Sequence, residues 1–383
     1  MDFSYSDEQK LLRMLKSKSL LPPILLMACL GFWACSDSRP KDATRDRAME
    51  AEEAELADLP HAHVFREGDK PYKRRPLNDP EWLTAENAAH MRPDDPILGF
   101  YLENKAWAVP LWIIRLPHVA NLTLDGKPVL ITFCTMCSSG NAFDPVLNGK
   151  RHTFRLAGFY NGSIIISDFE TGSIWSPYTT EALHGPLKGS KLERLPLYQC
   201  TWADWLALHP ASLVVYGAQK LRGKVDDATL VGAPGFKEPV KNSLLRPLDE
   251  RLPHNELILG VEINGQARAY PLAVLDKIGS VLNDTLGQKE IVVFHKPGTW
   301  LAIVFSRQVG DEVLVFAPTK DGGIVDRKYG GGGAMPGKPM AAFLPVASFL
   351  LFPLGSRNGI SGLRIIRRPK SSALTAFKQS VAI

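Results

Sequence analysis

Short apolar runs separated by turn residues dominate the middle of the chain. Residues 98–108 contain two such runs around a polar dipeptide, and residues 129–133 are a continuous β-branched and aromatic run. These patterns predict a hairpin and a buried strand. Residues 163–167 predict another strand, and residues 201–208, which precede His209-Pro210, predict a helix. The pattern therefore predicts a mostly β fold with few helices.

The strand pattern occurs twice. Residues 98–111 and 259–272, which lie 161 positions apart, are identical at six of fourteen positions. At the same spacing Cys134 aligns with His295, and at a spacing of 158 Asp168 aligns with Asp326. Several shared motifs in the same order indicate an internal duplication. We therefore expect a strand-rich module present as two pseudo-repeats.

Composition changes along the chain define five expected segments. Residues 36–76 are charged and poor in large apolar residues, as in a flexible tether, and the last segment ends in a basic, Gly-rich tail. The expected segments are an export signal over 1–35, the tether over 36–76, a first repeat over 77–215, a linker over 216–255 and a second, degenerate repeat over 256–383.

The N-terminus is typical of an exported lipoprotein. Lys16 and Lys18 precede an apolar run from Leu20 to Ala34, which is too short to span a bilayer that needs about 20 residues. The run ends at Cys35, the position of the acylated Cys in a lipoprotein box, with Cys29 as a competing site. We expect membrane attachment through an N-terminal lipid anchor at the cell envelope; the alternative is an unacylated signal.

The overall charge does not favour nucleic acid binding. The formal net charge is +5, but residues 327–383 contain nine basic residues and no acidic one. Without that tail, 36 basic residues face 40 acidic ones, so no basic groove is expected. Apolar residues make up 45% of the chain, which is enough for a sizeable core.

The clearest candidate for chemistry is the Cys-x-x-Cys pair formed by Cys134 and Cys137. This spacing suits a redox dithiol, two ligands of a metal site, or a structural disulfide. Covalent attachment of c-type haem is excluded, because Ser138 stands where a histidine is required. Cys200 remains as an odd third cysteine in the folded part.

The duplication suggests a further ligand for this pair. If the repeats pack about a pseudo-twofold axis, His295 would lie near Cys134 and Cys137, and two sulfurs with one imidazole suit zinc or copper. His184, in a loop, is a possible extra ligand. The simpler alternatives are an ordinary core or surface histidine at 295 and a solvated loop histidine at 184.

A second candidate site is formed by Asp168 and Glu170. Alternation along a strand end would point both carboxylates to one face, where paired carboxylates can perform acid–base chemistry. The alternative is structural, because Asp-x-x-Thr-Gly is typical of a strand-to-turn junction and Trp175 of a core anchor.

Four motifs occur in a fixed order: Thr-Phe-Cys-Thr-Met-Cys at 132–137, Asp-Phe-Glu-Thr-Gly-Ser-Ile-Trp-Ser at 168–176, Gly-Pro-Leu-Lys-Gly at 185–189 and Leu-Glu-Arg-Leu-Pro at 192–196. Together they resemble the family known as domain of unknown function 3179, found in exported bacterial and archaeal proteins. The resemblance implies no established activity. Thr135-Met136 replaces the Pro-Leu that the family usually has between the cysteines.

Three functions remain open at this point. The first is a cell-envelope protein that binds metal or assists redox chemistry through Cys134 and Cys137. The second is a hydrolase-like enzyme with a carboxylate site at Asp168 and Glu170. The third is a structural envelope protein in which the two cysteines form a disulfide.

Overall fold

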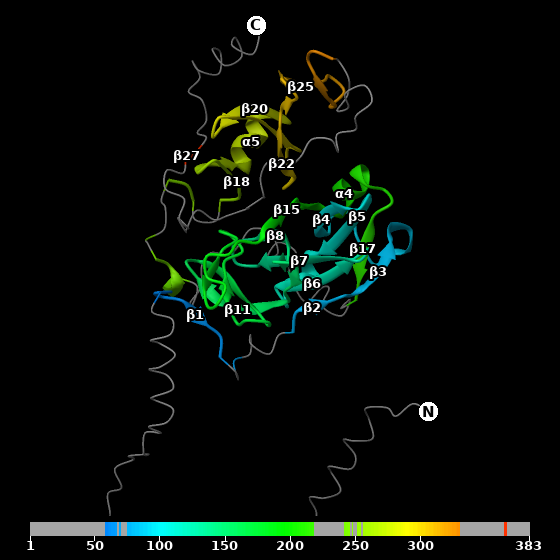
Figure 1. Ribbon diagram of the computed structural model, residues 1–383. Coiled ribbons are helices and arrows are strands. Elements are labelled where there is room, and N and C mark those ends of the chain that lie inside the picture. The colour runs from blue at the N-terminus through cyan, green and yellow to red at the C-terminus, as the bar shows by residue number, and fades with distance from the viewer. Residues whose placement is uncertain are drawn as a thin grey trace, which may run out of the picture. The chain divides into compact units, whose positions relative to one another are not determined.

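The structure, a computed structural model, shows the expected mostly β fold (Figure 1). It describes residues 58–66, 69, 75–217, 241–245, 247, 251–253, 256–329 and 364–365. All of these belong to one compact unit, residues 53–383. Among them are three α-helices, of four to seven residues each. The predicted export signal, with Cys29 and Cys35, most of the predicted tether and linker, and the Gly-rich stretch lie outside the described residues.

The predicted hairpin of the first repeat is formed by β4 (Pro96–Leu102) and β5 (Lys105–Pro110). Its turn residues Glu103 and Asn104 have φ values of 50° and 59°, the left-handed backbone that a tight two-residue hairpin requires. The hairpin lies in a five-stranded sheet of order β16-β4-β5-β17-β3. The other strands of this sheet are β16 (Tyr198–Thr201), β17 (Leu213–Tyr216) and β3 (Glu81–Thr84).

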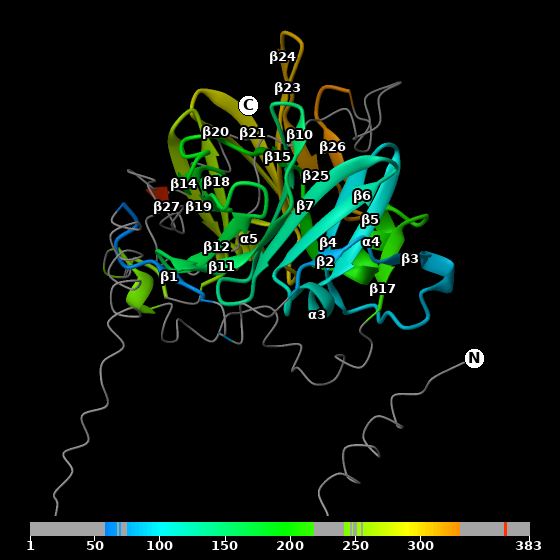
Figure 2. The same ribbon diagram turned by 60° about the horizontal axis from the view of Figure 1, so that its bottom comes forward.

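Two further five-stranded sheets complete the first repeat (Figures 1 and 2). One has the order β15-β8-β7-β6-β2, formed by β15 (Glu193–Leu195), β8 (Ser139–Asp144), β7 (Lys127–Cys134), β6 (Val119–Leu124) and β2 (Leu77–Asn78). The other has the order β1-β11-β12-β13-β14, formed by β1 (His63–Val64), β11 (Phe154–Tyr160), β12 (Ser163–Asp168), β13 (Ile174–Trp175) and β14 (Ala182–His184). The short hairpin of β9 (Val146–Leu147) and β10 (Lys150–Arg151) connects β8 of the first of these sheets to β11 of the second.

The helices are short and begin directly after strands. The predicted helix is α4 (Trp202–Leu208), where the Thr201 side chain accepts a hydrogen bond from the Asp204 N–H and so caps the first turn. The pattern did not predict α3 (Leu111–Ile114) or α5 (Leu272–Ile278). Each follows a proline that ends a strand, and each is too short for a helical period to be recognised in the sequence.

The second repeat has the same order of elements as the first, which supports the predicted duplication. A hairpin is followed by a short helix, a three-stranded antiparallel sheet and two more hairpins. The strands are β18 (Ile258–Ile263), β19 (Gln266–Pro271), β20 (Val281–Leu286), β21 (Lys289–His295), β22 (Ala302–Ser306), β23 (Gln308–Val309), β24 (Glu312–Val313), β25 (Phe316–Pro318) and β26 (Ile324–Asp326).

The spacing between the repeats changes by one residue after the first helix. Pro110 and Pro271 are 161 positions apart, but Val119 and Val281, where β6 and β20 begin, are 162 apart. The connection that contains α5 is one residue longer than the connection that contains α3. The constant spacing of 161 used for the sequence alignment therefore fails beyond this point.

This shift shows that the predicted alignment of Cys134 with His295 is wrong. The N–H of Phe133 bonds the carbonyl of the residue just before β6, and the N–H of His295 bonds the carbonyl of the residue just before β20. His295 is therefore the counterpart of Phe133, and Lys296 is the counterpart of Cys134. Because neighbouring strand residues face opposite sides of a sheet, a one-residue error reverses the side on which the side chain lies.

A buried asparagine confirms the spacing of 162. The side chain of Asn121 accepts a hydrogen bond from the Phe154 N–H and donates one to the Phe154 carbonyl, both at 2.9 Å. Asn283 makes the same two bonds to Phe316, at 3.0 and 2.8 Å. In both repeats this amide satisfies buried backbone groups at the first residue of β11 or β25.

The match between the repeats continues to the last described strand. Phe154 pairs with Asp168 at the end of β12, and Phe316 pairs with Asp326 at the end of β26. The two aspartates therefore occupy equivalent positions in the two repeats, as predicted. In the tail, β27 (Arg364–Ile365) pairs in parallel with β19, at the positions that correspond to the pairing of β17 with β5. In the second repeat the tail thus supplies the strand that corresponds to β17 of the first repeat.

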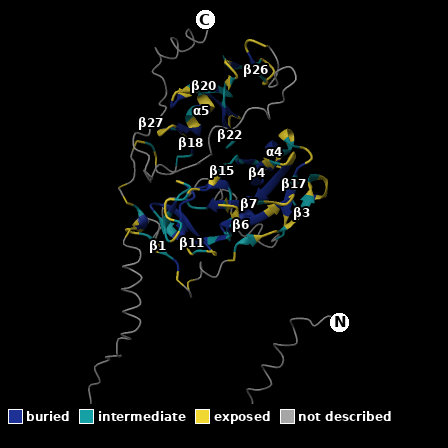
Figure 3. Ribbon diagram, viewed as in Figure 1, coloured by how far each residue is buried: buried dark blue, intermediate teal, exposed yellow. Residues whose placement is uncertain are grey.

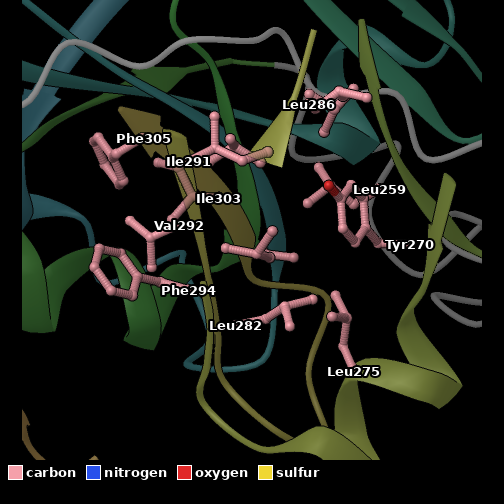
Figure 4. Close-up of a cluster of buried hydrophobic side chains, with 14 of the residues drawn as sticks. Leu259, Tyr270, Leu275, Leu282, Leu286, Ile291, Val292, Phe294, Ile303 and Phe305 are labelled. Carbon is pink, nitrogen blue, oxygen red and sulfur yellow. The ribbon is translucent and has the colours of Figure 1, made fainter. Parts of the chain in front are cut away.

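Each repeat has an apolar cluster formed mainly by its own side chains (Figures 3 and 4), with Tyr198 of the first repeat packed against the cluster of the second and Trp300 of the second against that of the first. In the second repeat one cluster joins the hairpin of β18 and β19, α5 and the sheet of β20 to β22, with Tyr270 fully buried. In the first repeat the apolar side chains of β7 divide between two clusters, with Phe133 in one and Leu130 and Cys134 in the other. No helix of the described residues is long and apolar enough to span a membrane.

Candidate functional site

The two cysteines lie in the turn between β7 and β8. Cys134 is the last residue of β7 and pairs with Ser139, the first residue of β8, so four residues form the turn. Ser138 adopts a left-handed conformation with a φ of 48°, and the Gln199 side chain donates a hydrogen bond to its carbonyl. The hairpin places both sulfurs at one strand end, as the sequence predicted.

The Cys137 sulfur lies in a small network of hydroxyl groups. The Tyr178 hydroxyl donates a hydrogen bond to it at 2.8 Å, and the Ser139 hydroxyl lies 3.3 Å away. The two hydroxyls also bond each other at 2.8 Å. Such donors stabilise charge on sulfur, although burial and the neighbouring Cys134 keep the pKa of Cys137 well above its usual value.

Cys134 has the opposite shift. Burial by itself would raise the pKa of its thiol, but hydrogen bonds from the Cys137 thiol and from the backbone at Cys137, Ile164 and Met136 lower it to about 7. The two thiols are therefore coupled and unequal: the Cys137 thiol donates to the Cys134 sulfur, which lowers the pKa of Cys134, and the pKa of Cys137 is raised. An arrangement of this kind stabilises one thiolate through its partner thiol.

Arg194 supports the tyrosine of this network. Its guanidinium donates hydrogen bonds to the Tyr178 carbonyl and to the Asn141 side chain. Burial lowers the pKa of Arg194 to about 10, so it is a cation at neutral pH. The bond to its carbonyl fixes the backbone at Tyr178, the residue whose hydroxyl bonds Cys137.

All three described cysteines are free thiols and all are buried. Cys134 and Cys137 are each 2% exposed, and the partly exposed Thr135 and Met136 separate them in the turn. Cys200 belongs to a different apolar cluster, around Trp202 and Trp205. Burial raises its pKa far above the usual value, and its place in the fold is that of a core residue.

His295 does not form a ligand set with the cysteines. Its Nδ1 lies 3.0 Å from the Leu301 carbonyl and its Nε2 lies 2.8 Å from the Asp276 carboxylate, so both ring nitrogens are engaged. Among the described residues, the group of three or more metal-ligating side chains that lie together is a different one. The predicted set of Cys134, Cys137 and His295 rested on the one-residue alignment error described above.

His184 is also engaged elsewhere. It ends β14, and its Nδ1 lies 2.9 Å from the Asp58 carboxylate. Lys188 donates to the other oxygen of the same carboxylate at 2.6 Å. This exposed ion pair draws the pKa of Asp58 down, first through the bond from Lys188 and then through the bond from His184. We therefore assign His184 to a surface ion pair.

Asp168 and Glu170 lie together, as predicted, but in unequal surroundings. Asp168 ends β12 and its side chain is fully buried, whereas the Glu170 side chain is 21% exposed in the following turn. The Asp168 carboxylate accepts hydrogen bonds from the Trp175 indole at 2.8 Å and from the Thr171 backbone at 2.6 Å. These bonds fit the structural alternative better than an acid–base pair open to substrate.

Sequence reasoning missed the partners of both groups. His152 lies beside Asp168 and Glu170, and Tyr178 and Arg194 lie beside the cysteines. Arg194 was visible as part of the Leu-Glu-Arg-Leu-Pro motif, but no local pattern marks His152 or Tyr178. His152 reaches Asp168 through the pairing of β11 with β12, and Tyr178 reaches Cys137 across 41 positions of sequence.

The comparisons with known proteins agree with the fold and the motifs. A model of the family described as "Protein of unknown function (DUF3179)" matches residues 76–227 and 231–321, which is more than half of the chain and falls into two consecutive segments. Neither a curated protein nor a solved structure matches the chain. On the evidence of the family model, the protein belongs to the DUF3179 family of proteins of unknown function.

Proposed function

We propose that the protein is a redox-accessory protein whose Cys134 and Cys137 form a redox-active dithiol. The observation that carries the proposal is the geometry of the turn between β7 and β8, which brings the two thiols into hydrogen-bond contact and places the Tyr178 and Ser139 hydroxyls at Cys137. The contact lowers the pKa of Cys134, while burial and Cys134 raise that of Cys137. A dithiol of this kind has one attacking thiolate and one resolving thiol ready at neutral pH.

The proposed reaction is thiol–disulfide exchange. The Cys134 thiolate attacks one sulfur of a substrate disulfide, and the other substrate sulfur leaves as a thiolate. The Cys137 thiol then loses its proton and attacks the Cys134 sulfur, which releases the second substrate thiolate. The dithiol loses two electrons and two protons, and the substrate disulfide becomes two thiols.

Burial restricts the substrate. Because each cysteine is only 2% exposed, the disulfide of a folded protein has no direct approach to Cys134, whereas a small disulfide needs only a local opening at Thr135 and Met136. We therefore propose a low-molecular-weight disulfide as the oxidant. The Tyr178 hydroxyl, 2.8 Å from Cys137, keeps the resolving sulfur in place during the exchange.

A redox titration tests the proposal. The purified chain is equilibrated in buffers of reduced and oxidised glutathione, free thiols are trapped with N-ethylmaleimide, and each cysteine is followed by peptide mass. We expect Cys134 and Cys137 to be lost together in one two-electron transition. Cys200, a thiol buried in another cluster, serves as the internal control and should remain reduced.

Two results would decide against the dithiol. The redox-active dithiol is excluded if both Cys134 and Cys137 stay reduced in fully oxidised buffer. It is also excluded if each cysteine is oxidised separately to a mixed disulfide. The Cys134→Ser variant supplies the matched control, because it keeps the hairpin and Cys137 and should show no two-electron transition.

A soft metal ion is the second candidate for this pair. Hydrogen-bond donors surround both sulfurs, and such donors also favour metal-bound thiolates. Zinc takes four ligands and the described residues bring only two sulfurs together, so copper(I), a soft ion that thiolates select, is the better fit. In the titration, a chain that resists oxidation and holds one copper ion, absent from the Cys134→Ser variant, would favour this candidate.

We also propose that the chain acts at the cell envelope, held by a lipid on Cys35. The support is the sequence pattern alone: a positive flank, an apolar run and a small residue before the cysteine. In cells fed a labelled fatty acid, Cys35→Ser should abolish labelling and move the protein from the membrane pellet to the soluble fraction. Loss of label in Cys29→Ser instead would assign the anchor to Cys29, and label in both variants would refute it.

A further inference from the structure

A second cluster of side chains in the first repeat has the composition of a metal site. His152, Asp168 and Glu170 place one ligand atom each within 4.8 Å of one another. His152 lies between β10 and β11, Asp168 is the last residue of β12, and Glu170 is in the turn that follows. The cluster therefore forms at one end of the β11–β12 hairpin, where Phe154 pairs with Asp168.

The distances between these three side chains fit ligands of one shared ion better than they fit hydrogen bonds. His152 Nδ1 lies 3.5 Å from Asp168 Oδ1 and 3.8 Å from Glu170 Oε2. Both separations exceed the usual length of an N–H···O bond. For metal–ligand bonds of about 2.1 Å, neighbouring atoms of a tetrahedral shell are about 3.4 Å apart. The imidazole and the two carboxylates thus have nearly the spacing that one cation would impose.

The imidazole nitrogen that faces the carboxylates has no partner. The His152 side chain is 5% exposed, and its Nδ1 is fully buried without a hydrogen bond. A buried ring nitrogen left unsatisfied costs about 1–3 kcal/mol. A cation between the ring and the carboxylates would remove this cost, since the neutral imidazole presents a lone pair at Nδ1 when its proton is on Nε2.

The two carboxylates are held in position by other groups. Asp168 is bonded by the Trp175 indole, the Thr171 backbone and the Thr171 hydroxyl. Glu170 accepts hydrogen bonds from the Thr153 N–H at 2.9 Å and from the Thr153 hydroxyl at 2.8 Å. Each carboxylate oxygen has two lone pairs, so each Glu170 oxygen keeps one free. Asp168 Oδ1, the oxygen nearest His152, keeps one when the Thr171 hydroxyl donates to Ser173, which lies 2.7 Å from it, instead of to the carboxylate. Outer hydrogen bonds of this kind orient the ligands of metal sites.

The second repeat supplies an internal comparison on the same backbone. The backbone N–H of His152 donates to the Pro145 carbonyl, and 162 residues later the backbone N–H of Leu314 donates to the Arg307 carbonyl. The counterpart of His152 is therefore Leu314, which is buried in the core of the second repeat. The fold accepts a plain apolar side chain at this position, so packing alone does not require a histidine there.

The other two positions also diverge. Asp326, the counterpart of Asp168, directs its carboxylate to the backbone N–H groups of Val315, Lys328 and Tyr329. Lys328 takes the position of Glu170, 158 residues later, and pairs with Glu312. The second repeat thus keeps the buried aspartate as a turn anchor. It has Leu314 and Lys328 in place of His152 and Glu170, so neither of the other two ligands is present.

We propose that His152, Asp168 and Glu170 bind a divalent transition-metal ion. One imidazole nitrogen with two carboxylate oxygens suits Zn²⁺ or Mn²⁺ rather than Ca²⁺ or Mg²⁺, which prefer shells made of oxygen alone. The three side chains leave at least one position of the shell for water or a small ligand. The site is separate from the cysteine pair and does not depend on the proposed redox function.

The test is a metal titration of the full chain after treatment with chelator. Zn²⁺ is titrated by calorimetry into the Cys134→Ser/Cys137→Ser variant, so that thiolates do not contribute, and Mn²⁺ binding is followed by its electron paramagnetic resonance signal. We expect one ion per chain. His152→Leu and Glu170→Lys, which install the residues of the second repeat, should each weaken binding at least about tenfold.

His184→Ala is the matched control, because it removes a histidine that is paired with a carboxylate outside the cluster. It should leave the affinity unchanged, and circular dichroism should show that His152→Leu remains folded. Absence of binding in the parent protein, or an affinity in His152→Leu equal to that of the parent, would overturn the proposal and leave His152 as a buried neighbour of the two carboxylates.

Discussion

Replacing Asp168 by alanine is expected to lower the free energy of unfolding by about 3–5 kcal/mol. The side chain is fully buried and accepts hydrogen bonds from the Trp175 indole at 2.8 Å and from the Thr171 backbone at 2.6 Å. Alanine leaves both donors without an acceptor, and bonds to a charged group are worth about 1.5–3 kcal/mol each. Urea unfolding followed by circular dichroism measures the change.

Two further variants show whether this loss comes from hydrogen bonding. Asp168→Asn keeps the size and one acceptor oxygen, so we expect a smaller loss than for alanine. Glu170→Gln changes a partly exposed side chain and should cost less than about 1 kcal/mol. A loss below about 1 kcal/mol for Asp168→Ala would show that the indole and the turn do not depend on this carboxylate.

Replacing Cys137 by alanine is expected to slow alkylation of Cys134 at pH 7 by about tenfold or more. The Cys137 thiol is the largest of the groups that oppose the effect of burial on Cys134. Without it the pKa of Cys134 rises from about 7, and each unit of increase reduces the thiolate fraction about tenfold once the pKa exceeds the pH. The rate of iodoacetamide reaction at Cys134, measured against pH by peptide mass, reports the change.

The conservative variant Cys137→Ser separates hydrogen bonding from packing. A serine hydroxyl can donate to the Cys134 sulfur, so the rate should recover towards that of the parent protein. Cys200→Ala, in another apolar cluster, should leave the pH profile unchanged. A midpoint that stays near pH 7 in Cys137→Ala would assign the low pKa to the backbone donors at residues 137, 164 and 136 and would weaken the proposed role of the Cys137 side chain.

The two sites share one apolar cluster of the first repeat. Cys134, Cys137, Trp175 and Tyr178 all belong to it, with Trp175 bonded to Asp168 and Tyr178 bonded to Cys137. Each aromatic ring therefore contributes apolar area to the core and directs its polar atom to a functional group. The second repeat has Lys296 and Leu314 at the positions of Cys134 and His152, so both groups are specific to the first repeat.

Much of the fold could be predicted locally. The runs at residues 98–108, 129–133 and 163–167 all lie in strands, and residues 202–208 form a helix. These elements follow from side-chain alternation, β-branched residues and turn residues, which act over a few positions. The connections at α3 and α5 were missed because helices of one or two turns show no clear period.

The sequence by itself determined the duplicated β architecture, the position of the cysteine pair at a strand end, the correspondence of Asp168 with Asp326, and the family. These depend on short patterns and on their order along the chain. They require no knowledge of which strands meet.

Only the tertiary structure decided which side chains share a site. One extra residue before β20 moves His295 off the position of Cys134, and in a strand such a shift reverses the face of every side chain. His152 reaches Asp168 through pairing of β11 with β12, and Tyr178 reaches Cys137 across 41 positions of sequence. These contacts depend on strand register and close packing, which the chain fixes only when the whole core is assembled.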